Sequence, residues 1–180
     1  MAIRQRDLVM NEVADAADFM ISIKRPGSGL VVVDSNHDLG LEKYIREGRY
    51  RGDGANFRDG LKLDDAYLEH RGRVARALDQ NEEPPSFSMF EFAARGLRPG
   101  DLGDVRWVHD GKSHTIDGVE CGHHGFRGAN GAKGTVAGFA RIGRKLSIAD
   151  KHSPEIMDGV YVAGCMKLSH GYNKGPSSWA

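Results

Sequence analysis

The feature that most constrains the fold of this chain is a short apolar segment that is followed directly by polar residues. Leu30–Val33 follows the breakers Pro26-Gly27-Ser28-Gly29, and Asp34-Ser35-Asn36-His37-Asp38 comes directly after it. A β-branched run of this kind predicts a buried parallel strand. Open α/β sheets carry their chemistry in the loops at the carboxyl ends of such strands. The polar residues therefore form either a candidate site or a turn in which Asp38 caps the next helix.

Two later predicted strands also end in loops that contain histidine. Val119–Cys121 leads into His123-His124, and Leu146–Ala149 leads into Asp150-Lys151-His152. Imidazole, carboxamide and carboxylate groups together suit Mn, Fe or Zn. Three such loops in succession favour a metal site over three unrelated polar turns.

The remaining patterns predict a mixed α/β chain. Apolar spacing predicts helices over residues 6–23, 39–47, 56–79 (broken near Gly60) and 135–145, with residues 48–54 as a loop. Another helix ends at Leu97 and is capped by Ser86 or Ser88. Asp110-Gly111 predicts a hairpin between strands 105–108 and 113–116, and Asp158-Gly159 predicts a second one between 156–157 and 160–163. The first helix and strand look like the second half of a β-α-β unit, whose first strand the chain lacks.

Composition narrows the class of protein. A chain of 180 residues is about the length of one domain. Lys plus Arg and Asp plus Glu are balanced at 25 each, so any nucleic-acid contact depends on local charge. Neither a signal core nor a run of membrane-spanning length is present, and two cysteines make no disulfide framework. We expect a soluble protein of a reducing compartment, the cytoplasm, with no membrane partner.

The order of these blocks resembles the calcineurin-like metallophosphoesterases. In that family a strand leads into Gly-Asn-His-Asp/Glu, a later strand into a lone His, and a last strand into Gly-His-x-His. The likeness is greatest to phage members associated with DNA transfer and degradation. They share a segment similar to His124–Gly134, and an ending similar to Gly171–Trp179. The resemblance covers residues 7–179. It implies part of an α/β-β/α sandwich, with residues 1–180 as one domain and 39–100 as a helical insertion.

The resemblance also implies roles for individual residues. Asn36 and His124 would ligate one metal, and His152 would ligate the other. His37 would be the general acid, oriented by Asp38. The implied activity is hydrolysis of phosphodiesters, with DNA as the substrate, in the host cytoplasm if the chain is phage-encoded. The implied cofactor is a divalent metal, with Mn favoured over Mg, Fe or Zn.

Two departures from the family pattern bear on this activity. Asp150 stands where the family has a metal-ligating His, and aspartate also ligates Mn or Mg. The family's first two blocks, Asp-x-His and Gly-Asp-x-x-Asn/Asp, would precede the first helix and are missing. They supply the carboxylate that bridges the two metals. We therefore expect a protein partner, or another copy of the chain in a homo-oligomer, to complete the site; otherwise the site is a remnant.

A glycine-rich basic segment supports a second interpretation. Residues 122–149 contain no acid, and Arg127 and Lys133 flank Gly128 and Gly131, whose backbone N–H groups can approach a phosphate closely. The chain would then be a catalytically degenerate module that binds nucleic acid or a protein partner. The segment can also be a flexible loop without a ligand. A structural zinc site at Cys121, His123 or His124, and Cys165 is disfavoured because Cys121-x-His123 is too tight a spacing.

Overall fold

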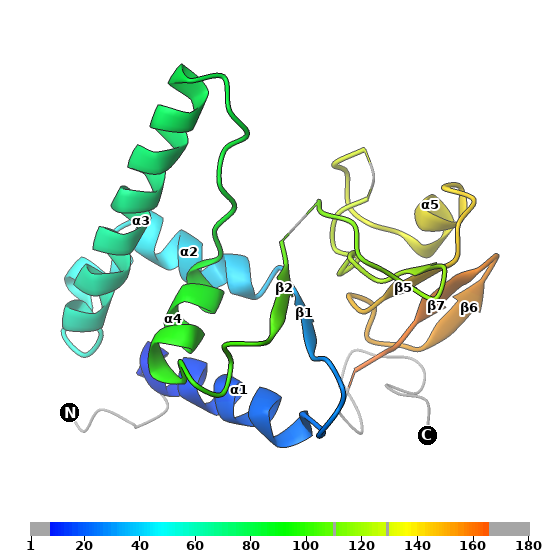
Figure 1. The fold of residues 1–180 in the computed structure, drawn as a ribbon, viewed down its shortest axis with the longest axis horizontal. Helices are drawn as coiled ribbons and strands as arrows, with labels where there is room; N and C mark the ends of the chain where they lie inside the picture. The colour runs from blue at the N-terminus through cyan, green and yellow to red at the C-terminus, as the bar shows by residue number, and fades with distance from the viewer. Residues whose placement is uncertain (1–7, 110, 129, 166–180) are drawn as a thin grey trace. The chain divides into compact units, whose positions relative to one another are not determined.

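A computed structural model describes residues 8–109, 111–128 and 130–165, and it confirms a mixed α/β chain. The chain divides into two compact units (Figure 1). The helical unit comprises residues 8–32 and 37–107 of the described chain, and the sheet unit comprises residues 33–36 and 108–165. The prediction of one domain with an insertion over residues 39–100 stays a prediction.

The helical unit contains α1 (Val9–Ile23), α2 (Asp38–Arg46), the 3-10 helix η2 (Arg49–Gly52), α3 (Phe57–Asp79) and α4 (Met89–Leu97). The predicted first helix is confirmed, and it buries Val13, Ala17 and Met20. Its start is held by Asn56, whose side-chain oxygen accepts a hydrogen bond from the Val9 N–H at 2.8 Å. The predicted loop over residues 48–54 contains η2.

The prediction of a break near Gly60 is wrong, because α3 runs through this position without interruption. Gly60 lies against Tyr50, which is completely buried. A Cβ atom at position 60 would lie 2.4 Å from the Cβ and Cγ atoms of Tyr50. The glycine is therefore required by packing between α3 and η2, not by a change in helix direction.

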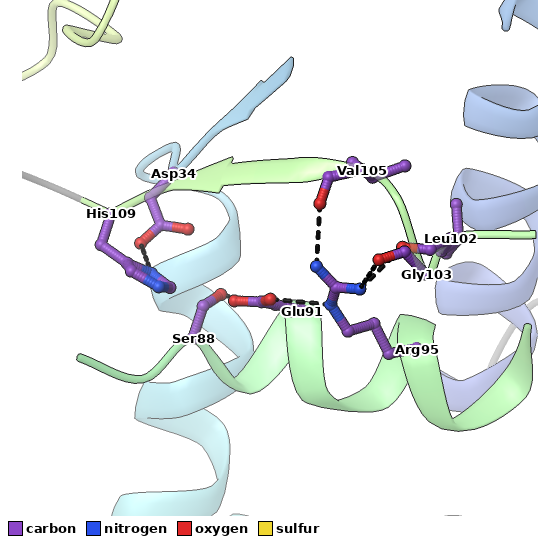
Figure 2. A network of polar contacts seen from close by, with 8 residues as sticks. All are labelled: Asp34, Ser88, Glu91, Arg95, Leu102, Gly103, Val105 and His109. Atoms are coloured by element: carbon purple, nitrogen blue, oxygen red, sulfur yellow. Dashed lines mark hydrogen bonds and ion pairs between the residues drawn. The ribbon is translucent and has the colours of Figure 1, made fainter. Parts of the chain in front are cut away.

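Ser88 is the residue that caps α4. Its hydroxyl oxygen accepts a hydrogen bond from the Glu91 N–H at 3.3 Å. Further along α4, the guanidinium of Arg95 donates to the carbonyl oxygens of Leu102 at 2.7 Å and Val105 at 2.8 Å (Figure 2). Arg95 thus fixes the segment that leads from α4 into the next strand.

That strand, β2 (Arg106–Val108), pairs with β1 (Val31–Val33) and not with the strand after it. The Arg106 N–H bonds the Leu30 carbonyl, and the Asp34 N–H bonds the Val108 carbonyl, each at 3.0 Å. From the first hydrogen bond to the second, the residue numbers increase along both strands, so β1 and β2 are parallel, as predicted for β1. The predicted hairpin around residues 110–111 is therefore wrong. β1 is half-buried rather than buried, because its sheet has only two strands.

The sheet unit is built on strands β3 (Thr115–Ile116), β4 (Val119–Glu120), β5 (Leu146–Ile148), β6 (Glu155–Met157) and β7 (Val160–Val162). Their order is β3-β4-β5-β7-β6. β4, β5 and β7 are parallel, and β3 and β6 are antiparallel edges. The hairpin at Asp158-Gly159 is confirmed, and a matching one is present at Asp117-Gly118. Both turns have positive φ at both central residues, which Asp-Gly favours.

The sheet packs against the short helix α5 (Val136–Ala140) through Val136, Phe139 and the apolar side chains of β5 and β7. The predicted helix over residues 135–145 is too long, because Gly143 has a φ of +71° and its N–H bonds the Ala140 carbonyl. This left-handed glycine ends the helical turn. The segment Gly171–Trp179 lies outside the described residues. Within the described chain, no helix combines the length and apolarity needed to span a membrane.

Candidate functional site

His124 and Asp150 lie together at the ends of two neighbouring strands. β4 and β5 are parallel, with Glu120 opposite Leu146, so the segments that follow them leave the sheet at the same edge. The His124 Nδ1 atom lies 3.9 Å from the Asp150 Oδ1 atom, and both side chains are only 17% exposed. The structure thus brings together two of the residues that the sequence predicts as metal ligands.

The backbone fixes this arrangement. The His124 carbonyl oxygen accepts hydrogen bonds from the N–H groups of Ala149 and Asp150, each at 2.8 Å. Gly125 follows with a φ of +109°, and a Cβ atom there would lie 3.3 Å from the Cβ atom of Asp150. A glycine is needed here both for its conformation and for the close approach of the two loops.

Asp150 has a different contact at each carboxylate oxygen. Oδ1 faces His124, and Oδ2 accepts a hydrogen bond from the Lys151 ammonium at 2.9 Å. The Lys151 charge balances the carboxylate, and Oδ1 lies on the side of the His124 imidazole. The separation of 3.9 Å is too long for a hydrogen bond, but the pair can contribute two ligands to one cation.

His152 follows two residues later and is half-buried. Its carbonyl oxygen lies 3.7 Å from the Cys165 thiol, within the distance of a hydrogen bond to sulfur. Cys165 comes from the segment after β7, so three successive parallel strands contribute to this edge of the sheet.

The first predicted block is divided between the two units. Asn36 is exposed and belongs to the sheet unit, whereas His37 and Asp38 belong to the helical unit. His37 is exposed and immediately precedes α2, and Asp38 is the first residue of that helix. His37 and Asp38 line one pocket of the helical unit. Their roles as acid and orienting residue stay predictions.

Asp34 and His109 form a pair that the sequence analysis missed. They directly follow the parallel strands β1 and β2, and the His109 Nδ1 atom lies 3.2 Å from the Asp34 Oδ2 atom (Figure 2). Asp34 is 7% exposed, so it is among the few buried polar residues in the described chain. The pairing of residues 75 positions apart follows from the β1–β2 ladder, which no local pattern indicated.

Glu120 is a second buried acid that the sequence analysis missed. It is 5% exposed, and its carboxylate accepts hydrogen bonds from the N–H groups of His114 at 2.9 Å and Gly122 at 2.7 Å and from the Ser113 hydroxyl. Burial by itself would raise the pKa of Glu120, but these hydrogen bonds outweigh it and lower the pKa below its usual range. Glu120 thereby holds the start of the loop that carries His124.

The described residues of the glycine-rich segment form a hairpin-like arrangement. Gly134 donates to the Phe126 carbonyl at 2.9 Å, and Gly128 donates to the Ala132 carbonyl at 2.8 Å. Arg127 and Lys133 form an antiparallel bridge, so two exposed cations stand opposite each other. A neighbouring pocket of about 390 Å³ is lined by Gly128, Asn130, Lys133, Thr135 and Arg141, among others.

Across residues 8–109, 111–128 and 130–165, no three His, Cys, Asp or Glu side chains form a group that could hold a metal. The disfavoured zinc site gains no support. Cys121 follows β4 and Cys165 follows β7, and β5 lies between these two strands in the sheet. The described residues thus bring His124 and Asp150 together as a pair, without a third such ligand.

Comparison with known proteins gives a match to a phage protein. The chain is 33% identical to Protein A1 of Escherichia phage T5 over 177 residues, which cover 97% of this chain. They cover 30% of Protein A1, so the chain spans less than a third of the length of that relative. No family model matches the chain, and no solved structure is significantly similar to it.

Proposed function

We propose that this chain contributes part of the active site of a metal-dependent phosphoesterase, a nuclease that hydrolyses phosphodiester bonds in DNA. The observation that carries the proposal is the His124–Asp150 pair at the ends of adjacent parallel strands. The order of the three histidine-containing loops, with its resemblance to the metallophosphoesterases, supplies the reaction class. The finer sandwich architecture is part of the proposal.

The chemistry of the pair fits a divalent metal. Two ligand atoms bound about 2.1 Å from one metal lie about 3.0–3.4 Å apart. The His124 Nδ1 and Asp150 Oδ1 atoms are 3.9 Å apart, so a side-chain movement of less than about 1 Å would suffice. Imidazole with carboxylate suits Mn, and Asn36 would be a further ligand of this metal. His152 would ligate the second metal, and a partner chain or second copy would supply the remaining ligands.

Asn36, His37 and Asp38 have defined tasks in this proposal. A bound metal would supply Lewis-acid activation of the phosphate. His37, exposed before α2, would donate a proton to the leaving oxygen, and Asp38 would orient its imidazole. Asn36 would contact the scissile phosphate.

Mn²⁺ binding tests the proposal directly. We expect His124→Ala and Asp150→Asn to weaken the affinity of the full chain for Mn²⁺ about tenfold or more, measured by the electron paramagnetic resonance of free Mn²⁺. Asp158→Asn is the matched control, because this aspartate lies in the β6–β7 turn with a positive φ that asparagine also adopts. Equal affinities in wild type, His124→Ala and Asp150→Asn would contradict the proposal.

A second assay tests the reaction. Supercoiled plasmid is incubated with Mn²⁺, the chain and a co-encoded polypeptide that carries the Asp-x-His and Gly-Asp blocks. We expect nicking that requires both polypeptides and is abolished by His124→Ala. If the mixture leaves the plasmid intact, the nuclease proposal fails.

The bridge between Arg127 and Lys133 favours a second candidate function, a catalytically degenerate module that binds nucleic acid. The bridge places the two cationic residues opposite each other, so a phosphate close to both would be attracted by both charges. Replacing both residues by alanine should weaken DNA binding and lower the salt slope by about 2, as fluorescence anisotropy measures. The matched control is Arg58→Ala with Lys62→Ala on α3. Unchanged DNA binding without Arg127 and Lys133 would exclude this function.

A further inference from the structure

Helix α3 carries a stripe of exposed apolar side chains. Successive positions of the stripe are separated alternately by four and three residues, which is the spacing along the seam of a coiled coil. Its four large apolar members are between 41% and 58% exposed. Single exposed apolar residues are ordinary on a protein surface, but a row in register with a helix indicates a docking face. The apolar members are Phe57, Leu61, Leu68, Ala75 and Leu78, and the same spacing passes through Asp64 and Arg71.

This stripe is not the side that holds α3 to its own unit. The side of α3 that faces the helical core buries Gly60, Leu63 and Ala77. On the same side, His70 stacks on Phe87 with ring centroids 4.8 Å apart. The exposed stripe lies about a quarter of a turn further around the helix. The 23 residues of α3 therefore carry a second apolar side, about three heptads long.

The two charged positions make the stripe complementary to a copy of itself. Asp64 and Arg71 lie on either side of Leu68, which is near the middle of α3. If a second α3 packs antiparallel about a two-fold axis near Leu68, Asp64 of each copy lies within one turn of Arg71 of the other. A parallel pair would instead place Asp64 beside Asp64 and Arg71 beside Arg71, and like charges repel. The charges therefore favour the antiparallel orientation.

The carboxylate of Asp64 is held in place for this contact. The Tyr50 hydroxyl donates to its Oδ2 atom at 2.6 Å, and the guanidinium of Arg51 lies 3.6 Å from the same atom. The Arg51 side chain is 71% exposed, so solvent weakens its attraction for the carboxylate. Arg71 of a second copy would meet the carboxylate at a contact that excludes water, where the attraction between charges is stronger.

A hollow beside the stripe can receive a side chain of the second helix. Its volume is about 430 Å³, and Ala75 and Leu78 of the stripe line it together with Phe87 and others. The antiparallel arrangement brings Phe57 of the second copy to this end of the helix. An aromatic side chain would then enter a partly apolar hollow, as a knob enters a hole between packed helices.

We propose that α3 is the interface through which two copies of this chain associate, antiparallel and with two-fold symmetry. Both copies present the same stripe, so the interface closes as a dimer. Sedimentation velocity tests the association of the full chain without metal or DNA, so its outcome is separate from that of the nuclease proposal. We expect a dimer that dissociates on dilution from about 0.5 mM to about 1 µM, a range that covers weak to moderate affinities.

Substitutions at Leu68 test the position of the two-fold axis. Leu68→Glu and Leu68→Lys each place like charges close together at the axis, so each should weaken dimerisation at least tenfold. An equimolar mixture of the two variants brings opposite charges together and should dimerise. Ile156→Glu is the matched control, because Ile156 is 60% exposed but lies on β6 of the sheet unit. Circular dichroism checks that the variants keep their helix content.

Arg71→Glu tests the orientation of the helices. In the antiparallel dimer the new carboxylate lies next to Asp64 of the other copy, so dimerisation should weaken about tenfold or more. A parallel dimer would change little, because residue 71 faces its own copy before and after the substitution. Arg76→Glu makes the same change of charge on α3 outside the stripe and should have no effect.

Three outcomes would overturn the proposal. The first is a chain that sediments as a monomer at every concentration. The second is a mixture of the two Leu68 variants that stays monomeric. The third is an Arg71→Glu variant that dimerises like wild type.

Discussion

Replacement of Glu120 should loosen the loop that leads to His124. This buried carboxylate receives hydrogen bonds from the N–H groups of His114 and Gly122 and from the Ser113 hydroxyl. Glu120→Ala leaves these donors without their acceptor, at a cost of about 1–3 kcal/mol for each group that stays unsatisfied. Glu120→Gln keeps an oxygen for the two N–H groups and loses the charge, which roughly halves the strength of such bonds.

Native-state hydrogen exchange measures this effect at the bonded groups themselves. We expect the amides of His114 and Gly122 to exchange about tenfold faster in Glu120→Gln, corresponding to about 1.4 kcal/mol, and about a hundredfold faster or more in Glu120→Ala. Glu155→Gln on the exposed edge strand β6 is the matched control and should leave both amides unchanged. Equal protection of these amides in wild type and Glu120→Ala would refute the reasoning.

The lowered pKa of Glu120 fixes the direction of the pH dependence. A carboxylate whose pKa is depressed in the folded protein contributes stability above its unfolded pKa, about 4.3, and that contribution is lost as the pH falls through the folded pKa. Protection of the two amides, corrected for intrinsic exchange, should therefore decrease in acid below about pH 4. Glu120→Gln removes this decrease, because its amide does not titrate.

Two further substitutions test the packing and capping of the helical unit. Gly60→Ala should lower the free energy of unfolding by about 1–3 kcal/mol in urea denaturation, because its Cβ would overlap the buried ring of Tyr50. Gly72→Ala in the same helix should raise the free energy of unfolding by up to about 1 kcal/mol. The opposite order of the two variants would disprove the packing argument. Ser88→Ala should lower the melting temperature, because the cap hydrogen bond at the start of α4 contributes about 1 kcal/mol to the free energy of unfolding. Ser86→Ala should leave the melting temperature unchanged, and equal effects of the two substitutions would show that Ser88 is not the cap.

Local sequence signals predicted the elements whose cause lies within a few residues. The helix over Val9–Ile23 follows from its apolar spacing, and the β6–β7 hairpin follows from Asp158-Gly159. The start of α4 follows from a capping serine, although the sequence left Ser86 and Ser88 as alternatives. Each depends on backbone conformation or on hydrogen bonds between near neighbours. These elements were therefore readable without knowledge of the fold.

The same local signals failed where distant segments compete. Asp110-Gly111 and Asp117-Gly118 carry the same turn signal, but only the second joins paired strands, because β2 pairs with β1 from the start of the chain. Gly60 was interpreted as a helix breaker, although its environment is the ring of Tyr50. In both cases the deciding contact is absent from the local sequence.

By itself, the sequence determined that histidine-containing loops follow short strands, and this placed His124 and Asp150 at the same edge of one sheet. Only the tertiary structure decided which groups accompany them. The buried carboxylates of Glu120 and Asp34 have partners that strand pairing brings close, across 6 positions for the His114 N–H and 75 for His109. A buried charge is stable only with such partners, and the residues that supply them are set by the paths of the strands.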